Sequence, residues 1–221
     1  MKSYEELAPE REEVAYWMRR LYRQGLTTCS GGNLSRRVDG ERALITPSSL
    51  DKGEIAADRI GLFAIDGENL TPHLKGSIET DMHLGVLRNR PDIDSVVHAH
   101  PVTATSFAAM EMRIRCDLTA EAYAVIGEVA YIGYRIMGSV QLAELVAEGM
   151  KRTNVGVMKN HGVITVGKSM LQAFDRIEVL ENAARMTWIT HSLGSCSPLS
   201  GEQRREIESG FWQTIHPPKA D

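Results

Sequence analysis

The sequence of 221 residues lacks a long apolar run, an excess of positive charge and a paired set of cysteines. No stretch is apolar enough to span a bilayer, and the polar residues 1–6 do not resemble a signal peptide. The net charge of −4 argues against nucleic acid or an acidic membrane surface as the main partner. We therefore expect a protein with no membrane and no nucleic-acid partner.

The three cysteines, Cys29, Cys116 and Cys196, are odd in number and share no C-x-x-C spacing. This pattern argues against a disulfide framework and against a cysteine-based zinc site, and it predicts a cytoplasmic location. The hydrophobic fraction of 43% and the charged fraction of 24% are those of an ordinary globular protein. Because no repeat, low-complexity tract or long linker divides the chain, we expect a single domain over residues 1–221.

Hydrophobic periodicity predicts a mixture of helices and strands. Helices are expected over residues 9–24, 103–110 and 139–150, from an N-cap at Ser77 to Pro91, from Ser169 onward with Trp188 inward, and after Ser200. Short strands are expected over residues 43–46, 60–66, 94–97, 129–134, 155–158 and 163–166. Several of these strands pair as hairpins, so the predicted fold class is α/β, with a largely antiparallel central sheet flanked by helices.

A buried strand running into His98-Ala99-His100 is the most informative stretch of the sequence. Side chains alternate between the faces of a strand, so His98 and His100 point the same way. Two imidazoles on one face could converge on a metal such as zinc, which needs three protein ligands and an open position for catalysis. The alternative is a pair of hydrogen-bonded core histidines.

His161 lies in a polar turn between two apolar strands and could supply a third imidazole. Three neutral ligands would leave the metal a strong Lewis acid, and such chemistry needs a nearby proton carrier. Glu79 is the natural candidate; if burial raised its pKa, it could deliver a proton as well as take one. The alternative is that Glu79 only complements the dipole of its helix.

Two polar loops precede or follow neighbouring strands. One contains Gly32 and Asn33, and the other contains Ser48 and Ser49. Backbone N–H groups, a carboxamide and hydroxyls can together hold an anion such as phosphate, although both loops are also ordinary turn sequences.

Five motifs occur in an order that resembles the class II aldolase/adducin family. They are Ser30–Ser35, Ile45–Ser49, Ser77–Glu79, Val96–His100 and Asn160–Gly162. The resemblance extends from the first helix to the long late helix, and it implies the class II aldolase-like fold for nearly the whole chain.

The resemblance also implies a function. A zinc ion would be held by His98, His100 and His161, and Glu79 would be the acid/base residue. The implied reaction cleaves a ketose 1-phosphate, such as fuculose, rhamnulose or 5-deoxyribulose phosphate, to dihydroxyacetone phosphate and an aldehyde through a zinc-stabilised enediolate. The substrate phosphate would lie against Gly32, Asn33, Ser48, Ser49 and Ser77. The family further implies a homotetramer with active sites at subunit interfaces.

Two positions depart from the family pattern. The second of the two serines expected before the catalytic carboxylate is Ile78, which removes a hydroxyl from the phosphate pocket. The nearby Lys75 could compensate with a charge or could be an ordinary solvated lysine. Thr119 stands where a tyrosine assists protonation in fuculose-type aldolases, so protonation need not follow that route.

Several alternatives remain open from the sequence. The same metal site could serve an epimerase, a dehydratase or a decarboxylase of a phosphorylated sugar or sugar acid. A non-catalytic adducin-like binding domain would share the fold, but such domains lack these metal ligands. Three histidines could also hold Mn²⁺, Co²⁺ or Fe²⁺ in place of zinc.

Overall fold

The computed structural model describes residues 1–212, and it contains one sheet of seven strands in the order β3-β2-β1-β4-β7-β6-β5. The strands are β1 (Asn33–Arg37), β2 (Arg42–Ile45), β3 (Gly61–Ala64), β4 (Ser95–Ala99), β5 (Val129–Ile132), β6 (Val155–Met158) and β7 (Gly162–Gly167). Every neighbouring pair is antiparallel except β5 and β6, which are parallel. The predicted α/β class with a largely antiparallel sheet is therefore confirmed.

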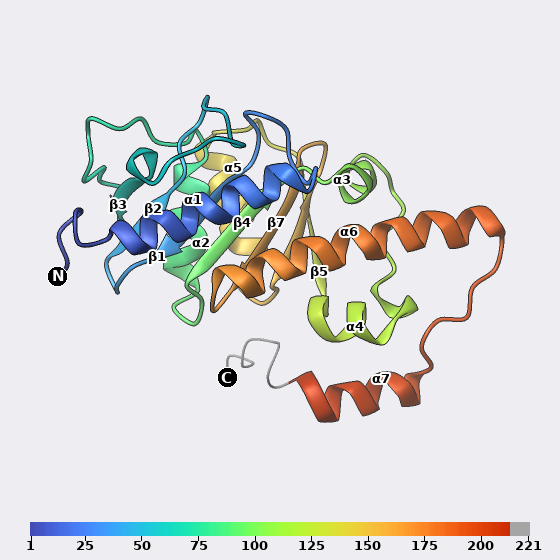
Figure 1. Cartoon of the computed structure of the whole chain (residues 1–221). Helices are drawn as coiled ribbons and strands as arrows, with labels where there is room; N and C mark the ends of the chain where they lie inside the picture. Colours follow the sequence, from blue (N-terminus) through green and yellow to red (C-terminus); the bar gives the residue numbers. More distant parts are fainter. Residues whose placement is uncertain (213–221) are drawn as a thin grey trace.

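Helices cover both faces of this sheet, with α1 and α6 on one face and α2 and α5 on the other (Figure 1). The α-helices are α1 (Ala8–Arg23), α2 (Thr80–Asn89), α3 (Val102–Ala108), α4 (Ala120–Ile126), α5 (Val140–Gly149), α6 (Met170–Leu193) and α7 (Gly201–Ile207). Short 3₁₀ turns lie at η1 (Ala57–Arg59) and η2 (Cys116–Leu118), and the π-helical turn η3 (Glu208–Trp212) follows α7.

The sheet separates two hydrophobic cores, because residues on its central strands alternate between the faces. Val97 of β4 joins the core beneath α1 and α6, whereas its neighbour Val96 joins the core beneath α2 and α5. Both side chains are fully buried. This two-sided burial fixes the register of β4, so that the residues at its end have defined directions.

The register brings three sequence segments together at one end of the sheet. His98 of β4 pairs with Asn33 at the start of β1 and with Ile164 of β7 on the other side. The turn carrying His161, between β6 and β7, therefore lies at the same end as the loop before β1. The central strands thus position most of the predicted site.

Three local predictions differ from the structure. Helix α2 begins at Thr80, with Glu79 and not Ser77 at its cap position, because the Ser77 hydroxyl is hydrogen-bonded within a buried polar network. Helix α4 was not expected from the pattern; Thr119 caps it by accepting a hydrogen bond from Ala122 N–H. Trp188 of α6 is 60% exposed and does not face inward.

The helices expected over residues 139–150, from Ser169 and after Ser200 are present. The hydroxyls of Ser139 and Ser169 cap α5 and α6, and Ser200 forms a capping box with Gln203 at α7. Within residues 1–212, no helix combines the length and the apolar character that a bilayer crossing requires.

Candidate metal and substrate site

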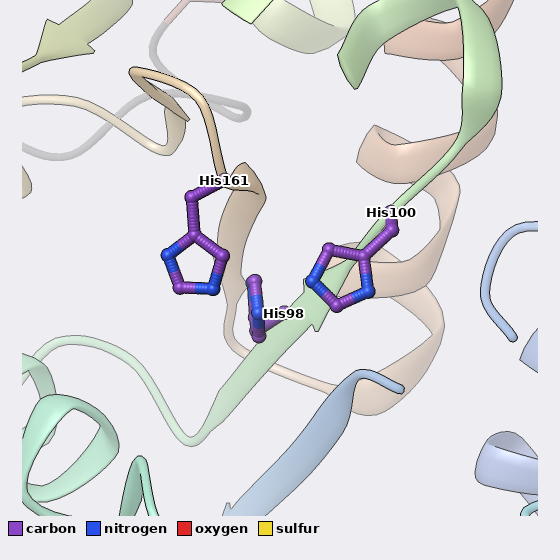
Figure 2. A group of neighbouring side chains, drawn as sticks. All are labelled: His98, His100 and His161. Carbon is purple, nitrogen blue, oxygen red and sulfur yellow. The ribbon is translucent and has the colours of Figure 1, made fainter. Parts of the chain in front are cut away.

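Three histidines converge at the end of β4, and they come from two different elements. His98 lies within β4, His100 follows its last residue, and His161 lies in the turn before β7 (Figure 2). Their candidate ligand nitrogens all lie within 4.8 Å of one another. The sequence prediction that His98 and His100 point to the same place is therefore met, and His161 joins them.

Close backbone packing makes this convergence possible. Asn160, at φ 54°, turns the chain before His161, and Gly162 follows it. A Cβ atom at Gly162 would lie 2.6 Å from both the Ala99 carbonyl oxygen and the His100 ring. Only glycine fits at this position without displacing the imidazoles.

The orientation of His98 is fixed by a backbone contact. Its Nδ1–H donates to the carbonyl oxygen of Val163 at 2.9 Å, so Nε2 carries the lone pair. A metal-binding histidine commonly has such a partner on its second nitrogen. Nε2 of His98 is fully buried and has no hydrogen-bond partner among the described residues.

Glu79 lies directly against the cluster. Its Oε1 lies 3.0 Å from His161 Nε2, and its Oε2 lies 3.3 Å from His98 Nε2. These approaches place the carboxylate against two ring nitrogens without hydrogen-bond alignment, and Glu79 Oε1 and His161 Nδ1 also have no hydrogen-bond partner within residues 1–212. Buried polar atoms without partners are uncommon, because each costs roughly 1–3 kcal/mol.

The electrostatics of the cluster suit a cation. Burial lowers the pKa of His98, and burial with the neighbouring His98 and His161 lowers the pKa of His100 to about 3. Both imidazoles are therefore neutral near pH 7, as metal coordination requires. Burial alone would raise the pKa of Glu79, but His98, His161 and the Asn33 amide together hold it below its usual range. Glu79 is thus ionised and can act as a base. The raised pKa that was considered from the sequence is not found.

The chemistry of the donors and the orphaned buried atoms fit a divalent metal held by His98, His100 and His161. Three imidazole nitrogens that lie within 4.8 Å of one another, with a carboxylate beside them, match a catalytic zinc site that keeps an open position. The same three imidazoles also suit Mn²⁺, Co²⁺ or Fe²⁺.

A polar network lies on the other side of Glu79. The Asn33 carboxamide donates to Glu79 Oε2 at 2.8 Å and to Ser77 Oγ at 3.1 Å. Ser77 Oγ lies 3.3 Å from Ser48 Oγ, which accepts a hydrogen bond from Ile78 N–H at 3.0 Å. Three of the residues predicted to hold phosphate therefore meet in one place. The Ile78 side chain, 56% exposed, turns outward, so this residue joins the network only through its backbone.

The other predicted phosphate residues lie around this network. Gly32, at φ 66°, brings the chain so close to β4 that a Cβ atom there would lie 2.9 Å from the His98 carbonyl oxygen. Ser49, also at a positive φ of 61°, and Lys75 line a neighbouring cavity of about 180 Å³ together with Ser48 and Arg59. Lys75 itself is exposed.

Two buried residues beside the site were not assigned a role from the sequence. His83 of α2 is fully buried and hydrogen-bonded to Asn33 and Ser35. Lys52 is also fully buried, and its ammonium donates to the Pro47 carbonyl oxygen. No sequence signal marks Lys52, since its neighbours Asp51 and Glu54 are exposed and polar.

The protein-family model described as the class II aldolase and adducin N-terminal domain matches residues 12–188 of the sequence. The chain belongs to this family. An L-fuculose phosphate aldolase of Methanococcus maripaludis is 35% identical over 175 residues, which are 79% of this chain and 94% of that protein. A 5-deoxy-D-ribulose 1-phosphate aldolase of Bacillus thuringiensis serovar kurstaki is 31% identical over 93% of this chain and 96% of that protein.

Other members of the class II aldolase family carry a different name. A 3-oxo-tetronate 4-phosphate decarboxylase of Pectobacterium atrosepticum is 30% identical, over 76% of this chain and 78% of that protein. Among solved structures, an L-fuculose 1-phosphate aldolase superimposes with a TM-score of 0.84 at 28% identity, over 91% of this chain and 95% of that one. These relatives support an enzyme of the aldolase or related lyase class, and their own names give phosphorylated sugars or sugar acids as substrates.

Proposed function

We propose that this member of the class II aldolase family is a metal-dependent aldolase that cleaves a ketose 1-phosphate to dihydroxyacetone phosphate and an aldehyde. The observation that carries this proposal is the placement of Glu79 against His98 and His161 at 3.0–3.3 Å. A divalent metal, most simply Zn²⁺, held by His98, His100 and His161 would supply Lewis-acid stabilisation of the negative charge that carbon–carbon cleavage leaves on the substrate.

Glu79 is the proposed proton carrier. Its ionised carboxylate takes the proton of the substrate hydroxyl next to the breaking bond; that C–O becomes the aldehyde as the carbon–carbon bond breaks. The electron pair of the broken bond stays with the dihydroxyacetone phosphate fragment, and Glu79 returns the proton to the carbon that lost its partner. The hydrogen bond from Asn33 holds the carboxylate in place for both steps.

The phosphate is proposed to lie against Gly32, Asn33, Ser48, Ser49 and Ser77. Their proximity to one another supports this assignment. Lys52 offers the buried positive charge that the sequence had suggested for Lys75. Its ammonium contacts the Pro47 carbonyl, immediately before Ser48, and within residues 1–212 it forms no ion pair with a carboxylate. A phosphate dianion in front of this loop would offset that charge.

The test is an aldol-direction screen of the zinc-loaded protein. Dihydroxyacetone phosphate is offered with lactaldehyde, acetaldehyde, glycolaldehyde or a methylthio-aldehyde, and products are followed by mass spectrometry. A new ketose phosphate with one aldehyde supports the proposal, and the Glu79→Gln protein is the control. Protein that binds one metal per chain but condenses no aldehyde would contradict it.

The second candidate is decarboxylation of a phosphorylated 3-oxo sugar acid, which the decarboxylase relatives favour. That reaction also leaves a carbanion next to a carbonyl, so the same residues could serve it. Carbon dioxide release from such an acid, without aldol condensation, would select this candidate over the aldolase. An epimerase or dehydratase on this site would show neither outcome.

Two further properties are proposed from the family. A homotetramer would place the active site at a subunit interface, and the exposed Trp188 is an apolar side chain that such an interface could cover. A cytoplasmic location accords with the cysteine pattern described above.

A further inference from the structure

His83 contacts the carboxamide oxygen of Asn33, whose NH₂ group meets Glu79. Its Nε2 lies 2.5 Å from Asn33 Oδ1, and its Nδ1 lies 2.8 Å from Ser35 Oγ. The ring is fully buried, and burial lowers the pKa of His83 to about 3, so the imidazole is neutral. A neutral imidazole has one N–H donor and one acceptor nitrogen, so its tautomer gives the contact a direction.

The direction follows from counting donors and acceptors at Asn33. Asn33 Nδ2 donates to two acceptors, Glu79 Oε2 at 2.8 Å and Ser77 Oγ at 3.1 Å, so the NH₂ group of the carboxamide faces this side. The carboxamide oxygen then faces His83, and His83 must donate to it from Nε2–H. Nδ1 is left as the acceptor, and the Ser35 hydroxyl donates to it.

The same network continues into the substrate side. Ser77 Oγ accepts hydrogen bonds from Asn33 Nδ2 and from Glu79 N–H. The Ser48 hydroxyl donates to Ser77 Oγ at 3.3 Å, and Ser48 Oγ accepts from Ile78 N–H. Ser77 therefore links the Asn33 amide to the loop that carries Ser48.

We propose that His83, as the Nε2–H tautomer, is a positioning residue that fixes the orientation of the Asn33 carboxamide and thereby the direction of the hydrogen bonds from Ser35 to Ser77. The opposite tautomer would turn the amide oxygen of Asn33 toward the Glu79 carboxylate, and two acceptors would then face each other. The substrate side of this inference rests on the proposed phosphate site, whereas the tautomer and the amide orientation do not.

The first test reads the tautomer directly and needs no activity. The full-length, zinc-loaded protein is labelled with ¹⁵N-histidine, and the ring nitrogens are observed by NMR. The His83 ring should show a protonated Nε2 and an unprotonated Nδ1 between pH 6 and pH 8, and its signals should disappear in His83→Gln. A protonated Nδ1 at His83 would overturn the proposal. His191→Gln, which changes an exposed histidine outside the site, is the control for assignment.

The second test separates positioning from a purely structural role. His83→Leu removes the donor, whereas His83→Gln keeps an N–H near the Nε2 position. We expect His83→Leu to lower kcat/KM by about 10–100-fold, a typical effect for a residue that orients a neighbouring active-site group. His83→Gln should recover most of that loss.

A double-mutant cycle completes the test. If His83 acts through the Asn33 amide, adding His83→Leu to Asn33→Ala should lower kcat/KM by less than about 3-fold further. A full additional loss in the Asn33→Ala background would show that His83 only supports the fold and would overturn the proposal. If the wild-type protein has no lyase activity, the proposed function fails, and the NMR result still decides the tautomer.

Discussion

The two sides of Glu79 differ in how their buried polar atoms are satisfied. Toward the histidines, Glu79 Oε1, His98 Nε2 and His161 Nδ1 have no hydrogen-bond partner within residues 1–212. Toward β1 and α2, the side chains of Asn33, Ser77 and His83 are hydrogen-bonded to one another and to their neighbours.

This difference separates two functions. A chain that keeps buried atoms unsatisfied loses stability unless something from outside supplies the partners. The histidine side is therefore built to receive a metal and a substrate, whereas the amide side holds Glu79 and the loops in position. Changes on the first side should abolish a function, and changes on the second should reduce it by degrees.

The largest effect is expected for a histidine of the cluster. His98→Ala removes one of three metal ligands, so metal content should fall well below one per chain. Because the Lewis acid supplies several kcal/mol, kcat/KM should fall by about 10³-fold or more. Metal analysis after dialysis and steady-state kinetics measure both effects. His191→Ala is the matched control, and full metal content in His98→Ala would mean that the cluster is not the metal site.

Glu79→Gln should separate metal binding from proton transfer. The three histidines are unchanged, so the metal should remain, while the loss of the proton carrier should lower kcat by about 10²–10⁴-fold. The control is Glu181→Gln, since Glu181 is also buried but accepts hydrogen bonds from the backbone N–H groups of Thr103 and Ala104 at the start of α3. That variant should lose stability and keep its turnover. Near-normal turnover in Glu79→Gln would remove Glu79 from its proposed role.

On the amide side, Ser48 and Ser49 form a matched pair. Both were predicted from the sequence to hold phosphate, and both line the neighbouring cavity, but only the hydroxyl of Ser48 is seen in the network with Ser77 and Ile78 among the described residues. Ser48→Ala should weaken binding of a phosphorylated substrate by about 10–100-fold, as expected for a lost hydrogen bond to a charged group. Ser49→Ala should weaken it less. Isothermal titration with dihydroxyacetone phosphate measures the difference, and equal effects would place the phosphate elsewhere.

The sequence predicts the metal side of the site better than the amide side. His98 and His100 share a face because strand side chains alternate, which is a local rule, and His161 follows from a turn between two apolar strands. The network around Asn33 joins β1, α2 and the loop after β2, and no local pattern states that these will meet. Ser77 is an example. Serine is a common N-cap residue, but the hydroxyl of Ser77 is hydrogen-bonded within the network.

The local sequence pattern also did not predict which lysine near the site is buried. Lys75 and Lys52 both lie in polar segments, and the one nearer to Glu79 in sequence was the natural candidate for a compensating charge. In the structure, Lys75 is exposed and Lys52 is fully buried. Their difference arises from packing between segments distant in the sequence; Lys52 N–H, for example, donates to the Cys29 carbonyl, just before the Gly32 loop.

The smallest effect is predicted for Lys52. Replacing it with methionine should raise the free energy of unfolding but weaken the binding of phosphate. Burial lowers its pKa from 10.5 to about 8, so at pH 7 the folded protein carries a buried ammonium at a cost of about 3 kcal/mol. Lys52→Met removes this cost and loses the hydrogen bond to Pro47, worth about 1 kcal/mol. The free energy of unfolding of the ligand-free protein should therefore rise by about 2 kcal/mol.

The pH dependence gives this prediction its sign. Between pH 8 and pH 10.5, the unfolded lysine binds more protons than the folded one, so the wild-type protein gains stability as pH rises through this window. Below pH 8 both states are protonated and the full cost remains. The advantage of Lys52→Met should thus be constant up to about pH 8 and shrink above it, as urea unfolding at several pH values would measure.

Inorganic phosphate tests whether the buried charge of Lys52 serves to bind an anion. If the Lys52 ammonium faces a bound anion, saturating phosphate should raise the melting temperature of the wild-type protein more than that of Lys52→Met, because binding to the folded state stabilises it. Lys52→Arg, which keeps the charge, should respond to phosphate more than Lys52→Met does. An equal response of Lys52→Met and the wild type would show that the charge serves the fold of the Pro47–Ser49 loop and not the anion. Lys52 would then belong with the residues that only position the site.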